Sequence, residues 1–499
     1  MKTASKTLAL IIALCMILSL SAFASGEASG APSGGDAASF YGVGATLLVS
    51  DGEMYVDDVE IESTVAGGAG VFAYDNGVAY VQNADIHTTQ GSAGGLHVAG
   101  GGTLYAWDCN VETEAGMAAA AIRSDRGGGT MVIDGGSYVT NGGTGAVYVT
   151  ADISIHDAYL YTGGSEAVAI EGKNTIRLFD CDLEGSMIAN SINDNKVWNI
   201  IVYQSMSGDA DVGTSHFEMV GGTLTTHAGP ILYNTNTSSY ITLSDVDIVR
   251  GDDTTYFLQV TGNASSRTWG RAGANGANCI FTAVDQELPG DVVYDTISNL
   301  DFYLLNGSEL TGAFRLNDTL NGGYSGDGIA NVTIDKDSTW VVTDNSYING
   351  TLSCEGKIEN ATVEDINGNV LFGSGEYTVT VGAFQQKVDV SGAGEVPVWE
   401  DYAVENPFGS AAPASGEPSG EASGTAGEDA LKDAYIEYLH EWLIAEDAVN
   451  DTMTEEIREN EFMPLIYAWD FETFPAEMLF SGMLENGCPM TFEEFVAAQ

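Results

Sequence analysis

Apolar and polar residues alternate along this chain in short runs, and the runs recur at a regular spacing. The run LYAWDCNVETEAG at residues 104–116 returns in a similar form as IRLFDCDLEGS at residues 176–186. Aligning the chain on the Asp of DCN, which we call position 0, places eight residues in one column: Asp58, Asn83, Asp108, Gly135, Asp157, Asp180, Gly221 and Asp245. Successive members of this column are about 24 residues apart, with the exception of one longer gap. A period of this size is typical of a solenoid.

Four columns around position 0 are apolar, at positions −4, −2, +1 and +3. Alternation at −4 and −2, and again at +1 and +3, is the period of two that a β-strand requires. The alternation changes phase at position 0, so the chain must bend there, and Asp, Asn and Gly tolerate the backbone angles of such a bend. A third strand follows in each repeat and is usually introduced by glycine, as in GVFAY at 70–74.

Three strands in each repeat of about 24 residues predict an all-β fold, a right-handed parallel β-helix in which each coil stacks on the last at roughly 4.8 Å. Leucine-rich repeats have a similar period, but their L-x-x-L-x-L-x-x-N consensus is absent from this sequence. A β-sandwich would not keep the phase change at the same repeat position throughout. We expect the β-helix to span residues 38–404, with its parallel part ending near residue 382.

This period and column pattern resemble the pectin-lyase-like superfamily of right-handed parallel β-helix proteins, especially its adhesin-like secreted bacterial members. The resemblance covers roughly residues 38–400 and implies the fold more than an activity. Enzymes of this superfamily are mostly polysaccharide lyases and hydrolases, and the G-H-G and R-I-K motifs of the polygalacturonase-like hydrolases are absent here. Acidic pairs are common in the chain, however, so a glycan-cleaving carboxylate pair is kept as an alternative.

The N-terminal residues have the composition of a secretory signal. Lys2 and Lys6 precede an apolar run that ends at Leu20, and Ala22-Phe23-Ala24 matches a small-x-small cleavage site. Residues 1–24 are therefore predicted to be a signal peptide, which implies a secreted, extracellular or cell-surface protein. No second apolar segment is long enough to span a bilayer, so we expect no membrane span in the mature chain.

Two segments rich in Ser, Gly, Glu and Pro, residues 25–37 and 405–428, predict flexible and solvated linkers. Beyond the second linker, apolar residues such as Leu431 and Tyr435 follow the spacing of an amphipathic helix. Residues 429–499 are therefore predicted to form a small α-helical module that follows the β-helix.

The charge of the chain is strongly one-sided, with 16 Lys and Arg residues against 71 Asp and Glu residues and a formal net charge of −55. A field of this sign repels nucleic acid and anionic lipid, so we expect no nucleic-acid partner. It attracts cations, and Ca²⁺ is the candidate outside a cell. Solubility alone is the simpler explanation of the same charge.

The cysteines do not have the pattern of a disulfide framework. Beyond residue 24 they are Cys109, Cys181, Cys279, Cys354 and Cys488. Cys109 and Cys181 share the small inward position +1 but lie three coils apart, which is about 14 Å at the stacking rise and beyond the ~7 Å limit for a disulfide. They are predicted to be buried free thiols that contribute packing.

The outward columns hold the candidate ligand-binding residues. Position −3 is tyrosine on three successive coils, and further aromatic residues lie at −1, +2 and +4 among carboxylates. The candidates are Tyr55, Tyr80, Tyr105, Trp107, Tyr159 and Tyr161. Aromatic rungs on a flat sheet can stack against sugar rings, while carboxylates can accept hydroxyl hydrogen bonds or hold Ca²⁺. The alternative is that stacked tyrosines only stabilise the outer face of the sheet.

One segment resembles a calcium-binding repeat. NGGYSGDGIAN at residues 321–331 is similar to the nonapeptide G-G-x-G-x-D-x-U-x, although it is a single copy with a displaced glycine. Asp318 and Asp327 are therefore candidate metal ligands, with Ca²⁺ as the metal.

These patterns predict a secreted or cell-surface, adhesin-like β-helix that is non-catalytic and binds a glycan or another surface through an acidic and aromatic face, with Ca²⁺ as a possible aid. One alternative is a polysaccharide lyase or glycoside hydrolase of the β-helix type. The other is a structural spacer whose helical C-terminal module is the binding unit.

Overall fold

The computed structural model describes residues 45–65, 67–115, 119–185, 187–189, 196–205, 208–264 and 270–408. These residues belong to one compact unit, Ala28–Ser410. The predicted signal peptide, the first predicted linker, most of the second and the predicted helical module lie outside the described residues. No helix in the described part of the chain is long and apolar enough to cross a membrane.

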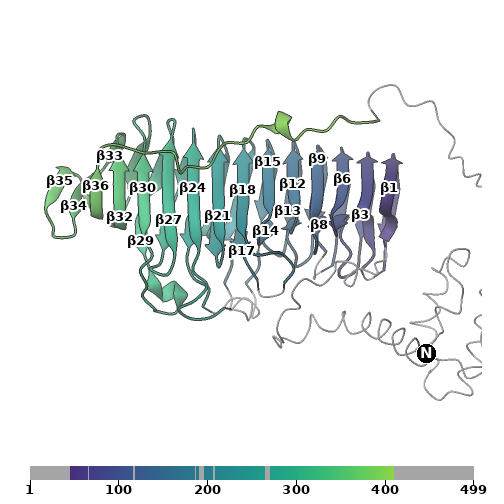
Figure 1. Ribbon diagram of the computed structural model, residues 1–499, viewed down its shortest axis with the longest axis horizontal. Coiled ribbons are helices and arrows are strands. Elements are labelled where there is room, and N and C mark those ends of the chain that lie inside the picture. Colours follow the sequence, from purple (N-terminus) through teal and green to yellow (C-terminus); the bar gives the residue numbers. More distant parts are fainter. Residues whose placement is uncertain are drawn as a thin grey trace, which may run out of the picture. The chain divides into compact units, whose positions relative to one another are not determined.

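The described unit is almost entirely β-structure, and its strands stand side by side in parallel (Figure 1). Each strand pairs with the equivalent strand one repeat later, as Tyr55 with Tyr80 and Tyr80 with Tyr105. Among the described strands, the antiparallel exception is the β34–β35 pair. The prediction of an all-β protein built from repeated parallel strands is therefore confirmed.

The 24-stranded sheet consists of two stacks of strands that share β1 and β3. The first stack comprises β1 (Ala45–Asp57), β3 (Ala69–Gln82), β6 (Gly102–Trp107), β9 (Gly129–Asp134), β12 (Asp152–His156), β15 (Thr175–Phe179), β18 (Thr214–Val220), β21 (Ser238–Ser244), β24 (Asn278–Val284), β27 (Asn299–Leu305), β30 (Ala330–Ile334), β32 (Ser346–Cys354), β34 (Ala361–Asp365), β35 (Val370–Gly373) and β36 (Tyr377–Gln385). The second stack comprises β5 (Leu96–Ala99), β8 (Ile122–Ser124), β11 (Val147–Val149), β14 (Val168–Glu171), β17 (Ile200–Tyr203), β20 (Leu232–Thr235), β23 (Leu258–Val260), β26 (Val292–Tyr294) and β29 (Phe314–Leu316).

Two further sheets form the third side of each repeat. The eight-stranded sheet comprises β2 (Glu60–Ser63), β4 (Asp85–Thr88), β7 (Asn110–Thr113), β10 (Ser137–Thr140), β13 (Tyr159–Thr162), β16 (Asp182–Gly185), β19 (Thr223–Gly229) and β22 (Asp247–Thr254). The four-stranded sheet comprises β25 (Glu287–Pro289), β28 (Glu309–Gly312), β31 (Thr339–Val342) and β33 (Lys357–Glu359). Two short 3₁₀ helices, η4 (Asp318–Asn321) and η5 (Trp399–Asp401), lie outside the sheets.

The residues at position 0 form the corner between the first stack and the eight-stranded sheet. All eight have a positive φ, from 48° at Asn83 to 78° at Gly135, in the left-handed region that Gly, Asn and Asp tolerate best. The amide of Asp58 donates to the carbonyl of Gln82, and the amide of Asn83 donates to that of Trp107, each at 3.1 Å. The predicted bend and the vertical alignment of these corners are therefore confirmed.

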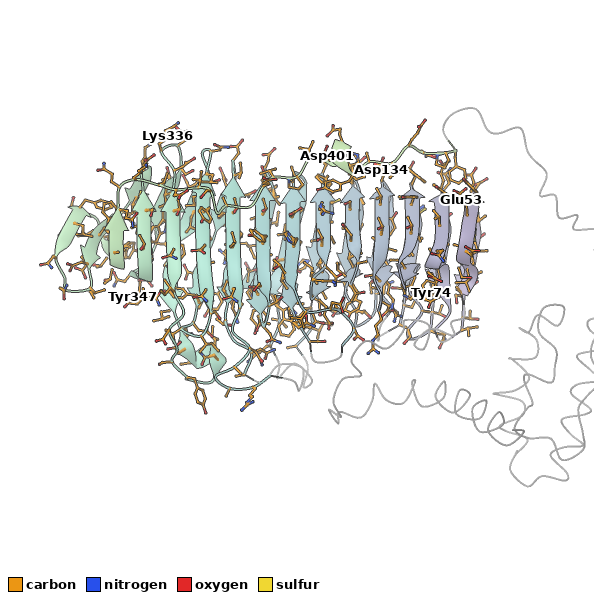
Figure 2. The ribbon with its side chains drawn as sticks, in the orientation of Figure 1. Glu53, Tyr74, Asp134, Lys336, Tyr347 and Asp401 are labelled. Carbon is orange, nitrogen blue, oxygen red and sulfur yellow. The ribbon has the colours of Figure 1, made fainter. Side chains whose placement is uncertain are left out.

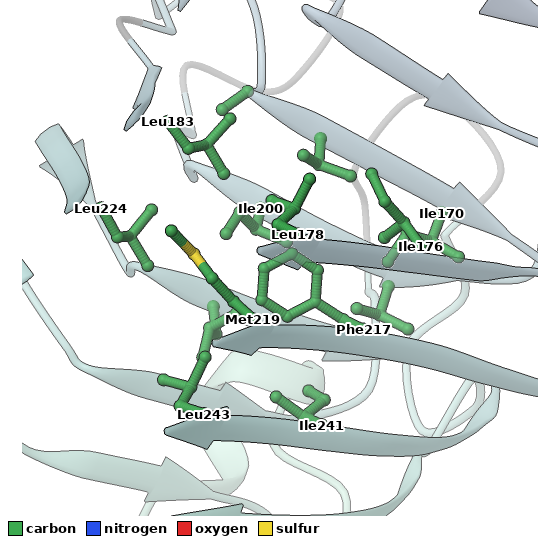
Figure 3. Close-up of a cluster of buried hydrophobic side chains, with 14 of the residues drawn as sticks. Ile170, Ile176, Leu178, Leu183, Ile200, Phe217, Met219, Leu224, Ile241 and Leu243 are labelled. Carbon is green, nitrogen blue, oxygen red and sulfur yellow. The ribbon is translucent and has the colours of Figure 1, made fainter. Parts of the chain in front are cut away.

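The core lies inside the coils and is filled by the four apolar columns together with inward side chains of the second stack, such as Val98 and Ile122. In Figure 3, Ile176 and Leu178 of β15 lie beside Phe217 and Met219 of β18, and all four side chains are buried. A single repeat cannot bury its apolar side alone, so successive coils supply one continuous core to each other.

The cysteines in this core are free, as predicted for Cys109 and Cys181. Cys109, Cys181, Cys279 and Cys354 are all buried and form no disulfide among the described residues. Burial raises the pKa of the Cys109 thiol to about 11 and that of the Cys181 thiol to about 12. Thiols with such a high pKa are poor nucleophiles at neutral pH.

After β36 the chain turns back along the outside of the first stack (Figure 1). We call residues 386–408 the returning segment. Its Gly394 amide donates to Thr282 Oγ1 at 2.8 Å, and its Asn406 Nδ2 donates to Gln82 Oε1 at 2.7 Å. The sequence predicts an irregular end to the array here and carries no sign of the return to the first coils.

Candidate ligand-binding surface

The three tyrosines at position −3 form a ladder on β1, β3 and β6. The ring centroids of Tyr55 and Tyr80 are 4.7 Å apart with an interplanar angle of 8°, and those of Tyr80 and Tyr105 are 5.3 Å apart at 35°. Trp107 lies next to Tyr105 with ring centroids 6.5 Å apart. The structure therefore brings together four of the six predicted binding residues.

The tyrosine rings of the ladder stack on one another, so most of their faces are already in contact. Two nearly parallel rings at 4.7 Å must overlap face to face, because coplanar rings at that distance would clash. Tyr55, the first ring of the ladder, is 55% exposed, whereas Tyr80 and Tyr105 are half-buried and Trp107 is 6% exposed. A sugar ring could therefore stack only at the open end of this ladder, on Tyr55.

The returning segment packs on the same ladder. Phe408 makes edge-to-face contacts with Tyr55 and Trp107, with ring centroids 6.1 and 6.4 Å apart. Its neighbour Asn406 holds Gln82, one coil above Tyr55, through the hydrogen bond given above. Phe408 therefore takes the place beside Trp107 that a bound ligand would need.

Further along the first stack, the returning segment covers charged residues. Trp399 stacks on His156 with ring centroids 4.8 Å apart, and the Arg177 guanidinium lies 4.2 Å from the ring centroid of Tyr402. Arg177 also pairs with Asp152 at 2.5 Å and with Glu218 at 3.3 Å. Figure 2 shows Asp401, at the end of η5, beside the edge of the stack along which this segment runs.

Small residues allow the returning segment to approach the sheet closely. A Cβ atom on Gly394 would lie only 2.5 Å from Thr242 Oγ1. Thr242 and Thr282 alternate with buried apolar residues and so point outward, yet they are 1% and 0% exposed. This part of the outer face of the first stack is closed by the chain itself.

Tyr159 and Tyr161 lie elsewhere, on β13 of the eight-stranded sheet. Their rings are nearly parallel, with centroids 6.3 Å apart, and Tyr159 is 39% exposed. The Tyr159 hydroxyl donates to Glu184 at 3.3 Å, and Glu184 also accepts a hydrogen bond from the His227 ring at 2.7 Å. The six predicted aromatic residues therefore belong to two different outer faces.

The outward side of the eight-stranded sheet is open and acidic, and we call it the acidic face. Its carboxylates at positions +2 and +4 are Glu60, Glu62, Asp85, Glu112, Asp182, Glu184 and Asp247. A shallow groove of about 340 Å³ crosses β2, β4, β7 and β10 on this face. Asn110 Nδ2 donates to Asp85 Oδ1 at 2.8 Å across neighbouring strands, so the polar side chains are ordered by their own contacts.

The two candidate metal ligands have different surroundings. Asp318 Oδ1 accepts hydrogen bonds from the amide and the hydroxyl of Thr296, both at 2.8 Å, and Oδ2 accepts one from Ser325 at 3.3 Å. Asp327 is exposed. In the described ranges, no group of three or more His, Cys, Asp or Glu side chains is placed to hold a metal ion. Calcium binding by Asp318 and Asp327 stays a prediction.

No protein-family model, no curated protein and no solved structure matches this chain. Its function is therefore inferred from the chemistry of the two outer faces that carry the predicted aromatic residues, one of them partly covered by the returning segment and the other open.

Proposed function

We propose that residues 38–404 form a right-handed parallel β-helix of the adhesin-like secreted type, and that it binds a glycan or another surface without catalysis. The observation that supports this function best is the openness of the acidic face, in contrast to the outer face of the first stack. The predicted signal peptide of residues 1–24 supports a place outside the cytoplasm.

The acidic face has the chemistry needed to hold hydroxyl-rich polymers. Carboxylates on successive coils, such as Glu60 and Asp85, can accept hydrogen bonds from hydroxyl groups along a chain. Tyr159 adds an exposed ring beside Asp182. Because outward side chains recur from coil to coil at the strand spacing, the face suits an extended ligand better than a small molecule.

The charge of the face selects among glycans. With a net charge of −55, the protein repels an anionic polymer unless a cation bridges the two. A neutral glycan is therefore the preferred ligand, and Ca²⁺ is the cation that would extend binding to an acidic one.

A glycan array probed with the full-length protein, with and without EDTA, tests this function. We expect binding to neutral glycans that EDTA leaves unchanged, and binding to acidic glycans only when Ca²⁺ is present. Tyr159→Ala should weaken binding about fivefold, because one stacked ring contributes about 1 kcal/mol. Tyr324→Ala, which removes an exposed tyrosine outside the acidic face, is the matched control.

A reducing-sugar assay on the glycans that bind separates this function from the enzymatic alternative. We expect no release of reducing ends during prolonged incubation. Release that disappears when a single carboxylate of the acidic face is replaced by its amide would contradict the non-catalytic proposal.

A further inference from the structure

The third side of the repeats is interrupted between two sheets. β22 is the last strand of the eight-stranded sheet and β25 is the first of the four-stranded sheet, and no strand pairing joins them among the described residues. The corner just before the interruption is intact, since the Asp245 amide donates to the Asp285 carbonyl at 3.3 Å. The two strands therefore separate directly after a shared corner.

A side chain replaces the missing backbone contact. At other corners the amide at position +2 donates to the carbonyl at position +1 of the preceding coil, as Asp247 does to Gly222 at 2.9 Å. Here Gln286 Nε2 donates to the Val246 carbonyl at 2.8 Å instead, and Gln286 Oε1 accepts from the Val246 amide at 2.7 Å. The carbonyl that should pair with β25 is thus already occupied.

Proline adds a second obstacle to pairing. Pro289 ends β25 and has no amide hydrogen, so it cannot donate to a neighbouring strand. Gln286 Nε2 also donates to the Glu287 carbonyl at 2.7 Å, so this side chain caps the start of both edges. The interruption is therefore a consequence of Gln286 and Pro289, and beyond Val246 the edge of β22 that faces β25 has no strand partner among the described residues. Unpaired strand edges are templates for pairing with another chain.

The interruption opens a groove with a volume of about 540 Å³. Ile248 and Leu288 line it from its two sides, and Ile248 is half-buried whereas Leu288 belongs to the core. Its carboxylates come from both sheets and are Asp245, Asp247, Asp285, Glu287 and Glu309. A bound segment would therefore meet the edge of β22, the side chain of Ile248 and negative charge on both sides.

A cation of the chain itself already reaches across the interruption. A Cβ atom on Gly290 would lie 3.0 Å from Arg250 Nη1, so the guanidinium of β22 lies against the residue that follows β25. Arg250 Nη2 also lies 3.4 Å from the Thr254 carbonyl that it donates to. The gap therefore accommodates a guanidinium close to the backbone.

We propose that the interruption between β22 and β25 binds an extended basic peptide segment of a partner protein by strand addition. Main-chain hydrogen bonds from the segment supply the pairing that the edge of β22 lacks. Lys or Arg side chains at alternate positions lie along the carboxylates of both sheets, and the residues between them pack on Ile248. This site uses neither Tyr159 nor Tyr161, so it does not depend on glycan binding.

Fluorescence anisotropy of a labelled ten-residue peptide, with Arg alternating with Val, tests the site on the full-length protein. We expect saturable binding that weakens as salt rises. The double variant Asp247→Asn, Glu287→Gln should bind at least tenfold more weakly than the wild type. The matched control, Glu60→Gln, Asp85→Asn, removes the same charge from the far end of the eight-stranded sheet and should bind like the wild type.

A second peptide separates strand addition from simple charge attraction and requires no variant protein. It has the same sequence but carries N-methyl groups on alternate backbone nitrogens, which remove the donors on one edge. We expect it to bind the wild type at least tenfold more weakly. Equal binding of both peptides, or an equal loss in the two double variants, would show a general electrostatic attraction and overturn the proposal.

Discussion

Phe408 packs edge-on against Tyr55, although the two residues lie near opposite ends of the described chain. The contact exists because the returning segment runs back along the first stack to the first coil. The same ring also packs against Trp107, so two residues of the aromatic ladder contact the returning segment. The ladder is a docking surface for the protein's own chain.

Replacing Phe408 with alanine should loosen the end of the returning segment. Each of its two aromatic contacts is worth about 0.5–1.5 kcal/mol, so we expect a loss of about 1–3 kcal/mol in local stability. Limited proteolysis should then cut within residues 386–408 faster than in the wild type. Val398→Ala, at a residue that is 53% exposed, is the control and should leave the cleavage rate unchanged. Equal cleavage of Phe408→Ala and wild type would show that Phe408 does not secure the segment.

The corner positions should tolerate substitution by glycine better than substitution by alanine. Asp108 has a φ of 48°. Among residues that carry a Cβ atom, only Asn and Asp adopt this left-handed conformation with little strain. Asp108→Ala is expected to lower the free energy of unfolding by about 1 kcal/mol, while Asp108→Gly should be close to neutral. Urea denaturation of both variants measures the difference. A glycine variant that is less stable than the alanine variant would contradict the role assigned to the corner.

Much of the fold could be predicted from the sequence because each repeat shows the same local alternation of apolar and polar residues. The phase change at Asp58, Asn83 and Asp108 marks both the strands and the corner, and each strand pairs with its own copy one period later. The column continues at Asp285 and Asn306, with φ values of 50° and 56°, but the long insertion before Asp285 hid it from the alignment.

The covered face could not be predicted in the same way. The returning segment has no periodic pattern, and its partners, such as Gln82 and Arg177, are set by the path of the chain in space. The orientation of Tyr80 relative to Tyr55 is also a property of packing, since the sequence shows a ladder without showing which way its rings face. A signal for the sheet interruption was present, because Gln286 replaces a small residue at position +1.

Stability should fall on mild acidification because of His97. Burial lowers the pKa of His97 below its ordinary value of 6.5, despite its hydrogen bond to Asp125 at 3.0 Å, and Arg123 also disfavours the charged ring. Below about pH 6.5 the unfolded chain takes up a proton that the folded ring resists, so folding weakens until the pH reaches the folded pKa. Urea unfolding at pH 7.5 and 5.5 should show this loss.

His97→Gln should reduce the difference in stability between the two pH values. His87→Gln is the control, because the His87 side chain is 42% exposed and should keep the wild-type difference. An unchanged difference in His97→Gln would assign the acid sensitivity to other groups.

The core thiols should resist modification. Burial raises the pKa of Cys279 to about 12 and that of Cys354 to about 11, close to the values for Cys181 and Cys109. Iodoacetamide labelling followed by peptide mass spectrometry should leave these four sites unmodified in the native protein and label them fully in urea. Rapid native labelling of Cys109 or Cys181 would contradict their place in the core.

The choice of binding face is the central claim, and one comparison of two variants tests it most directly. Tyr159→Ala, Tyr161→Ala alters the acidic face, whereas Tyr80→Ala, Tyr105→Ala alters the ladder beneath the returning segment. Both should be measured against the same glycan by isothermal titration calorimetry. We predict a loss of affinity of tenfold or more in the first variant and wild-type affinity in the second. Full affinity in the first variant together with a loss in the second would place the ligand on the ladder and contradict the claim.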